Sequence, residues 1–207
     1  MIKTIIFDIG GVLLKTEDRT PRHKLDEQFG LPYGTVEELV FNSEQGRRAQ
    51  LGELSTEAHW QLIGKQFELD EDALAAVRLA FWAGDRLDES LVAYIRQLKQ
   101  VYETAVISNA FDDLRHVLTH EFQIADAFNL LVISAEEGIM KPDARIFART
   151  LARLGRKPEE AVFIDDFVHN VEGAKAVGLH AIHYQPGTNL PQKLAELGVH
   201  VNANRPS

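Results

Sequence analysis

The hydrophobic residues of this chain fall into two kinds of pattern. Short runs rich in β-branched and aromatic residues occupy positions 3–7, 102–107, 128–133, 161–164 and 180–184. Between them lie longer stretches in which apolar residues recur every three to four positions. The runs predict β-strands, and the stretches predict amphipathic helices. Because strands that alternate with helices are typical of a parallel sheet covered on both faces, we predict an α/β protein.

The interval between the first two predicted strands is unusually long, since one crossover helix needs only about a dozen residues. Its helical pattern predicts helices at 20–29, 34–43, 55–67 and 70–83. Ser55 and Asp70 are suitable N-caps for the last two. We therefore expect an inserted helical cap at 16–87 and a core formed by 1–15 and 88–207.

Other helix boundaries carry their usual signals. Asp88 and Asp143 stand where N-caps are expected, and Gly155 and Gly178 stand where helices should end. The segment 185–207 contains three prolines and predicts one short helix followed by a loose end.

Composition narrows the possible functions. A net charge of −9 argues against nucleic acid as a main partner, because binding to a phosphate backbone requires a basic face. The absence of cysteine excludes disulfides and thiolate chemistry. No apolar run is long enough for a membrane span, and the first residues lack the pattern of a signal peptide. We expect a cytoplasmic protein, and the oligomeric state stays open.

Polar residues with catalytic potential follow the predicted strands. Asp8 ends the first strand within Phe7-Asp8-Ile9-Gly10-Gly11-Val12, and Ser108-Asn109, Lys141 and Asp165-Asp166 follow later ones. Each has an ordinary explanation as a turn residue, a helix cap or a solvated charge. Together they supply a nucleophile, a hydroxyl, an ammonium group and paired carboxylates, which is the set that phosphoryl transfer requires.

Four segments carry a resemblance to a known family: IIFDIGGVLL (5–14), AVISNA (105–110), GIMKPDARIF (138–147) and VFIDDFVHNVEGAKAVGL (162–179). In this order they resemble the haloacid dehalogenase superfamily, in the branch with a helical cap after the first motif. Within it, the chain is similar to sugar-phosphate phosphatases such as glucose-1-phosphate phosphatase and to the phosphatase domain of soluble epoxide hydrolase. The resemblance implies a Rossmann-like core.

The resemblance also implies a nucleophile and a Mg²⁺ cofactor. Asp8 would attack phosphorus, form an aspartyl-phosphate and ligate Mg²⁺. The backbone carbonyl of Gly10 would be a further ligand. Asp166 would bind the ion directly, and Asp165 would act through water or a neighbouring group. Oxygen ligands of this kind suit Mg²⁺.

The phosphate group would be held by other residues of the matching segments. Lys141 would bridge the nucleophile and the phosphate as a point charge. The hydroxyl of Ser108 and the backbone N–H of Asn109 would bind phosphate oxygens.

One catalytic group of the family is missing. Its phosphatases usually carry a second Asp two residues after the nucleophile, which protonates the leaving oxygen, and here that position is Gly10. General acid–base groups contribute ~10²–10⁴-fold, so turnover should be lower but not abolished. Glu17, Asp18 or His59 are conceivable substitutes.

The remaining candidates favour structural roles. We expect Arg47 and Arg48 to be solvated, Arg145 to form a surface ion pair, and His169 and Asn170 to be structural or to lie at the rim of the site. Trp60, Phe81 and Trp82 have helical spacing and predict the cap interior.

The leading hypothesis is a Mg²⁺-dependent phosphatase that acts on a small phosphorylated metabolite. A metal-independent 2-haloacid dehalogenase is an alternative that Gly10 mildly favours and that the Asp165-Asp166 pair disfavours. A pseudoenzyme that binds a phosphorylated ligand without turnover is the other alternative.

Overall fold

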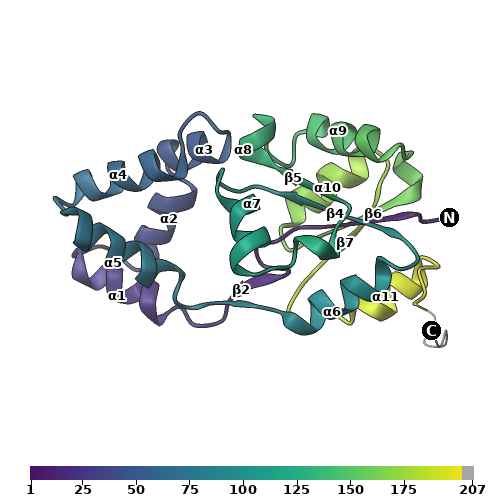
Figure 1. Ribbon diagram of the computed structural model, residues 1–207, viewed down its shortest axis with the longest axis horizontal. Helices are drawn as coiled ribbons and strands as arrows, with labels where there is room; N and C mark the ends of the chain where they lie inside the picture. Colours follow the sequence, from purple (N-terminus) through teal and green to yellow (C-terminus); the bar gives the residue numbers. More distant parts are fainter. Residues whose placement is uncertain (202–207) are drawn as a thin grey trace.

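A central parallel sheet organises the computed structural model, which describes residues 1–201 (Figure 1). Its strand order is β5-β4-β1-β6-β7, and each neighbouring pair runs parallel. The strands span Thr4–Phe7 (β1), Glu103–Ser108 (β4), Leu130–Ile133 (β5), Ala161–Asp165 (β6) and His180–His183 (β7). Each lies within two residues of its predicted position, so the predicted α/β sheet is confirmed.

Both faces of the sheet are buried, as the alternation in β1 shows. Ile5 and Phe7 belong to the apolar cluster on one face, and Ile6 belongs to the cluster on the other. Residues of α6 (Glu89–Leu98) and α11 (Leu190–Glu196) pack into the first cluster. Residues of α9 (Ala144–Leu154) and α10 (Val168–Ala176) pack into the second. The result is the expected Rossmann-like arrangement of helix, sheet and helix.

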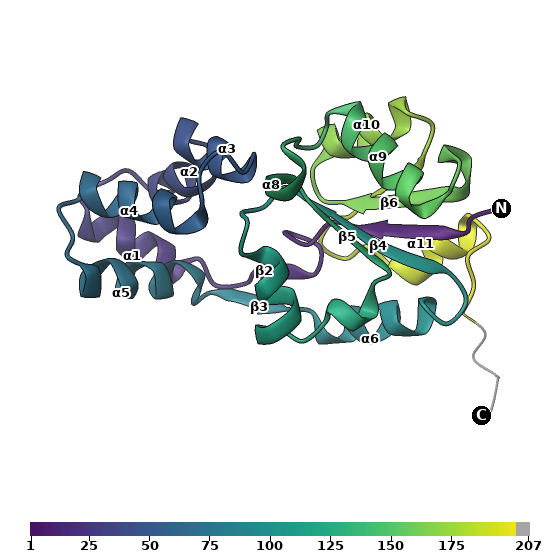
Figure 2. The same cartoon turned by 45° about the horizontal axis from the view of Figure 1, so that its top comes forward.

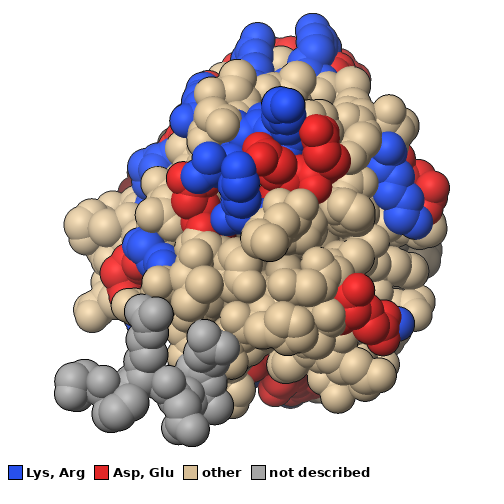
Figure 3. All heavy atoms as spheres, turned by 90° about the vertical axis from the view of Figure 1, so that its right-hand side faces the viewer, with Lys and Arg blue, Asp and Glu red and all other residues tan. Residues whose placement is uncertain are grey.

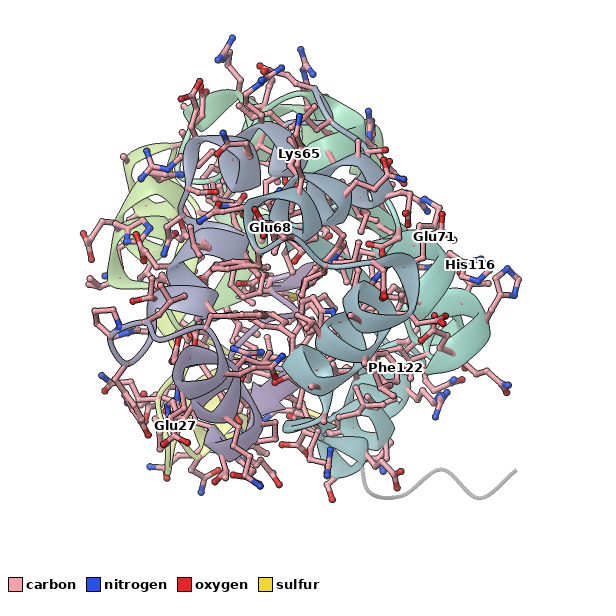
Figure 4. All side chains as sticks on the ribbon, turned by 90° about the vertical axis from the view of Figure 1, so that its left-hand side faces the viewer. Glu27, Lys65, Glu68, Glu71, His116 and Phe122 are labelled. Atoms are coloured by element: carbon pink, nitrogen blue, oxygen red, sulfur yellow. The ribbon has the colours of Figure 1, made fainter. Side chains whose placement is uncertain are left out.

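Five helices lie beyond the carboxyl ends of the strands, at the left of Figure 1. We call them the helical layer: α1 (Thr20–Gln28), α2 (Thr35–Phe41), α3 (Glu44–Gln50), α4 (Thr56–Gln66) and α5 (Glu71–Trp82). They enclose a hydrophobic cluster of their own, in which Trp60 and Phe81 are buried and Trp82 is partly buried. Figure 4 shows Lys65, Glu68 and Glu71 on the outer, solvent-exposed side of this layer.

The sequence prediction missed one helix of the layer. The predicted helix at 34–43 is shorter in the structure, and α3 follows it after a break at Asn42 and Ser43. The side chain of Ser43 accepts a hydrogen bond from the backbone N–H of Gly46 and so begins the new helix. A helix of seven residues with the sequence EQGRRAQ offers too little apolar periodicity to be recognised. The starts at Ser55 and Asp70 are confirmed as side-chain caps.

A two-stranded antiparallel ribbon joins the helical layer to the sheet. It pairs β2 (Leu14–Thr16) with β3 (Asp85–Leu87). Figure 2 shows both strands between the helical layer and the central sheet. The prediction missed it, because three-residue strands carry no readable alternation. The ribbon holds the two ends of the inserted segment together.

The short elements between β4 and β6 are single turns. They are α7 (Leu114–His116), a π-helical turn (Val117–Glu121), 3₁₀ turns (Ala125–Ala127, Pro158–Glu160) and α8 (Ser134–Glu137). The predicted N-caps Asp88 and Asp143 are confirmed, and Gly155 ends α9 with a positive φ.

The carboxyl-terminal part of the chain contains the predicted short helix, α11, while the predicted loose end at 202–207 lies outside the described residues. On the face seen in Figure 3, basic and acidic side chains lie side by side. Ion pairs near the start of the sheet strands include Lys3–Glu160 and Arg156–Glu103. Within residues 1–201, no helix combines the length and the apolar character that crossing a membrane requires.

Candidate active site

The strand order places three site residues at neighbouring strand ends. β1 lies between β4 and β6, and Phe7 is level with Val106 on one side and Ile164 on the other. Asp8 is therefore level with Asp165, while Ser108 ends β4 one residue further along. This meeting of carboxyl ends is where α/β proteins bind ligands.

Asp8 is held in place from two sides. The residue is 6% exposed, its Oδ1 accepts a hydrogen bond from the backbone N–H of Ile9 at 2.7 Å, and Lys141 Nζ forms an ion pair with the same oxygen at 2.9 Å. The pKa of Asp8 is raised from 3.8 to about 7, because burial and the charge of Asp165 raise it more than Lys141 lowers it. Additional positive charge beside this buried carboxylate would favour its charged form.

Lys141 and Asp165 form a buried ion pair beneath Asp8. Lys141 Nζ lies 2.6 Å from Asp165 Oδ2, and neither side chain has exposed area. Asp165 also accepts hydrogen bonds from Asn170 Nδ2 and from the backbone N–H of Phe167. Four donor contacts leave Asp165 with little capacity to bind an ion directly. Asn170 is thus a buried structural residue, although its contact with Asp165 was not foreseen.

Asp166 differs from its neighbour because it has an unsatisfied oxygen. Its Oδ1 is buried without a hydrogen-bond partner among residues 1–201. Burial and the charge of Asp165 raise the pKa of Asp166. Carboxylate oxygens of Asp8, Asp165 and Asp166 lie within 4.8 Å of one another. A cluster of hard oxygen donors with one orphaned atom fits a Mg²⁺ ion.

Gly11 allows this cluster to form. Its φ is +69°, and a Cβ at this position would lie 2.0 Å from Asp166 Oδ2. Any larger residue would displace the carboxylate from the turn that carries Asp8. His183, which the sequence did not single out, fixes Asp166 from the other side through a 2.8 Å hydrogen bond between Nε2 and the Asp166 carbonyl oxygen.

The side chain of Asn109 binds the backbone of Lys141, a contact that the sequence did not indicate. Its side-chain amide donates to the carbonyl oxygen of Lys141 at 2.9 Å and accepts from the N–H of Lys141 at 2.7 Å. The amide therefore fixes the backbone that carries the buried ammonium group. Ser108 is buried at the end of β4, and the loop after it is held by Ser134, whose Oγ accepts from the N–H of Ala110. The only sequence signal for the role of Ser134 in holding this loop is its position directly after the strand β5.

The three conceivable substitutes for the missing acid differ in burial. His59 is fully buried within the helical layer, where Nε2 contacts the Val40 carbonyl oxygen at 2.9 Å. Glu17 and Asp18 are exposed, and Asp18 accepts from the backbone N–H of Thr20. Gly10 itself is exposed, at the beginning of the loop that leads to β2.

The helical layer touches the site through the loop after Asn109. Phe111 is 4% exposed and packs in the layer's hydrophobic cluster. The N–H and Oγ1 of Thr56 both donate to Asp112 Oδ1, at 2.9 and 2.5 Å. Arg47 and Arg48 are exposed, and Arg145 pairs with Asp143, as expected for surface charges.

The sequence of this chain matches that of a known protein family. Residues 2–178 match the sequence pattern of the haloacid dehalogenase-like hydrolases. The chain is 30% identical to mouse acyl-CoA dehydrogenase family member 10 over 99% of its own length, but it spans only 20% of that protein. It is 31% identical to glyceraldehyde 3-phosphate phosphatase of Pyrococcus furiosus, over 95% of the chain and 84% of that enzyme.

A solved structure shares the fold. It is a haloacid dehalogenase family enzyme of Bacteroides thetaiotaomicron in complex with magnesium and inorganic phosphate. The TM-score is 0.77 at 20% identity, over 93% of this chain and 99% of that one.

Proposed function

Because the chain belongs to the haloacid dehalogenase-like hydrolase family, we propose that it is a Mg²⁺-dependent phosphatase of small phosphorylated metabolites, of the sugar-phosphate type. The observation that carries the proposal is the carboxylate cluster with its orphaned Asp166 oxygen, set beside a buried nucleophile. The phosphatase from Pyrococcus furiosus and the magnesium and phosphate complex support the same chemistry.

In this proposal, the carboxylate cluster binds the metal and supplies the nucleophile. Asp8, Asp166 and the carbonyl oxygen of Gly10 hold Mg²⁺, which when bound neutralises charge on the phosphate oxygens. Asp165 acts through Lys141, because its oxygens are already occupied. Asp8 attacks phosphorus through its free oxygen and becomes an aspartyl-phosphate.

The phosphate group lies between Lys141 and the end of β4. The Ser108 hydroxyl and the backbone N–H of Asn109 donate to its oxygens, while the Asn109 side chain positions Lys141. We propose further that residues 16–87 act as the cap over this site, and that residues 1–15 and 88–207 form the catalytic core. This cap is supported by the contacts that Phe111 and Asp112, in the loop after β4, make with the helical layer.

Release of inorganic phosphate from a panel of sugar and glycolytic phosphates tests the activity. We expect release with Mg²⁺, none in EDTA, and none from Asp8→Asn. The exposed Arg145→Ala, outside the cluster, serves as a control for handling and folding. Halide release from 2-chloropropionate in EDTA would instead establish the dehalogenase, and tight phosphate binding without turnover would establish the pseudoenzyme.

A further inference from the structure

The oxygen that leaves phosphorus needs a proton unless it is stable as an anion. The source of that proton therefore decides which esters a phosphatase can cleave. Position 10, two residues after Asp8, carries glycine and supplies no proton. The side chains around this position determine whether anything replaces it.

The space beside Gly10 is open. A Cβ built there has no heavy atom within 4 Å, leaving out Gly10 and its two chain neighbours, Ile9 and Gly11. The oxygens of an aspartate at this position would lie about 2.5 Å from its Cβ, given ordinary bond lengths. An acid from elsewhere that occupied the same place would lie inside the 4 Å limit. Within residues 1–201, no side chain takes the place of this carboxyl group.

The titratable groups nearest the nucleophile have other partners. Asp165 accepts from Lys141, Asn170 and Phe167, and Lys141 shares its protons between two carboxylates. His183 uses Nε2 on the backbone of Asp166. These contacts occupy Lys141, Asp165 and one ring nitrogen of His183, and Asp166 is a proposed Mg²⁺ ligand.

We infer that the protein, as the phosphatase proposed above, selects phosphate monoesters whose leaving oxygen is a weak base, such as aryl, enol or anomeric phosphates. Among sugar phosphates, anomeric esters are favoured, and esters with an alkyl leaving group are cleaved more slowly. The inference rests on the proposed function, and it names the substrate class by the chemistry of the leaving group.

The reaction balances without a protein acid. An Asp8 oxygen bonds to phosphorus, the bond from phosphorus to the leaving oxygen breaks, and the electron pair departs with that oxygen. The anion then takes its proton from water. In the second step, water attacks phosphorus and loses a proton to solvent, and the bond to Asp8 breaks to give inorganic phosphate. The first step slows as the leaving oxygen becomes more basic, because no donor offsets the developing charge.

A graded set of esters tests the inference. The set is 4-nitrophenyl, phenyl and benzyl phosphate, which share a ring and differ in the basicity of the leaving oxygen. For the wild type we expect kcat/KM to fall steeply along this series. Gly10→Asp restores a carboxyl group in open space and at a position without positive φ. It should raise kcat/KM for the benzyl ester by ~10²–10⁴-fold and change the 4-nitrophenyl ester far less.

Gly10→Asn is the matched control. It fills a similar volume but has no acidic proton, so the ratio between the 4-nitrophenyl and benzyl esters should stay close to that of the wild type. The wild-type series needs no variant, and it is informative even if both substitutions impair folding. A flat wild-type series, or equal effects of Asp and Asn, would overturn the inference while leaving the phosphatase intact. Absence of phosphate release from every ester by the folded wild type with Mg²⁺ would instead reject the proposed function.

Discussion

Replacing Asp8 with Asn should stabilise the metal-free protein at pH 8, although it removes the proposed nucleophile. The pKa of this carboxyl group is raised from 3.8 to about 7, because burial and the charge of Asp165 raise it more than Lys141 lowers it. Folding at neutral pH must therefore either protonate Asp8 or bury its charge. An amide of the same shape avoids both costs.

The expected magnitude follows from the two pKa values. The unfolded chain loses the Asp8 proton near pH 4, whereas the folded chain keeps it up to about pH 7. Between these values the folded state binds more protons, so its stability falls as the pH rises, and the full cost is present above pH 7. The interval from 3.8 to about 7 corresponds to roughly 4 kcal/mol, at about 1.4 kcal/mol per pH unit.

Urea unfolding in EDTA at pH 5 and pH 8 measures this effect. The advantage of Asp8→Asn over the wild type should grow by about 3 kcal/mol between the two pH values. Asp143→Asn is the control, because the hydrogen bond from Arg145 lowers the pKa of Asp143 to about 2. Its titration is complete below pH 5, so its difference from the wild type should not change. A pH-independent difference for Asp8→Asn would refute the reasoning.

Three other substitutions probe the supports of the site. Lys141→Met leaves two buried carboxylates without their cation and should lower the unfolding free energy at pH 8 by about 3–5 kcal/mol, measured in urea. Gly11→Ala places a Cβ 2.0 Å from an Asp166 oxygen at a φ of +69°, so calorimetry should show weaker Mg²⁺ binding. Thr56→Val removes a hydrogen bond to Asp112 and should cost about 1–3 kcal/mol, whereas an unchanged urea midpoint would contradict that contact.

The sheet could be predicted because each strand carries its own local signal. Runs such as Thr4–Phe7 and Ala161–Asp165 are wholly buried, and buried parallel strands appear in sequence as continuous apolar segments. The site could be predicted only as a set of strand ends. That Asp8 lies between Ser108 and Asp165 depends on the strand order, which is a property of the whole sheet and is not written in any one segment.

The contacts and elements that the prediction missed lack a distinctive signal in the sequence around them. The amide of Asn109 and the backbone of Lys141 are 32 residues apart in the chain, and nothing local to Asn109 indicates that partner. The contact between Asn170 and Asp165 was also missed, because an Asn on the first turn of a helix such as α10 is equally typical of a surface residue. The short α3 and the β2–β3 ribbon were missed because tertiary packing stabilises them more than their own sequence does.

The adjacent residues Asp165 and Asp166 explain why the site needs two carboxylates in sequence. Asp165 is the last residue of β6, whereas Asp166 follows it outside the strand, and the two carboxylates have different partners. Asp165 is level with Asp8 on the neighbouring strand, which lets a single Lys141 reach both. The carboxylate of Asp166 lies beside the turn at Gly11, where the absence of a Cβ leaves room for it. Its Oδ1 has no hydrogen-bond partner among residues 1–201. The first carboxylate thus fixes the ammonium group beside the proposed nucleophile, and the second has the unsatisfied oxygen that the proposed Mg²⁺ would bind.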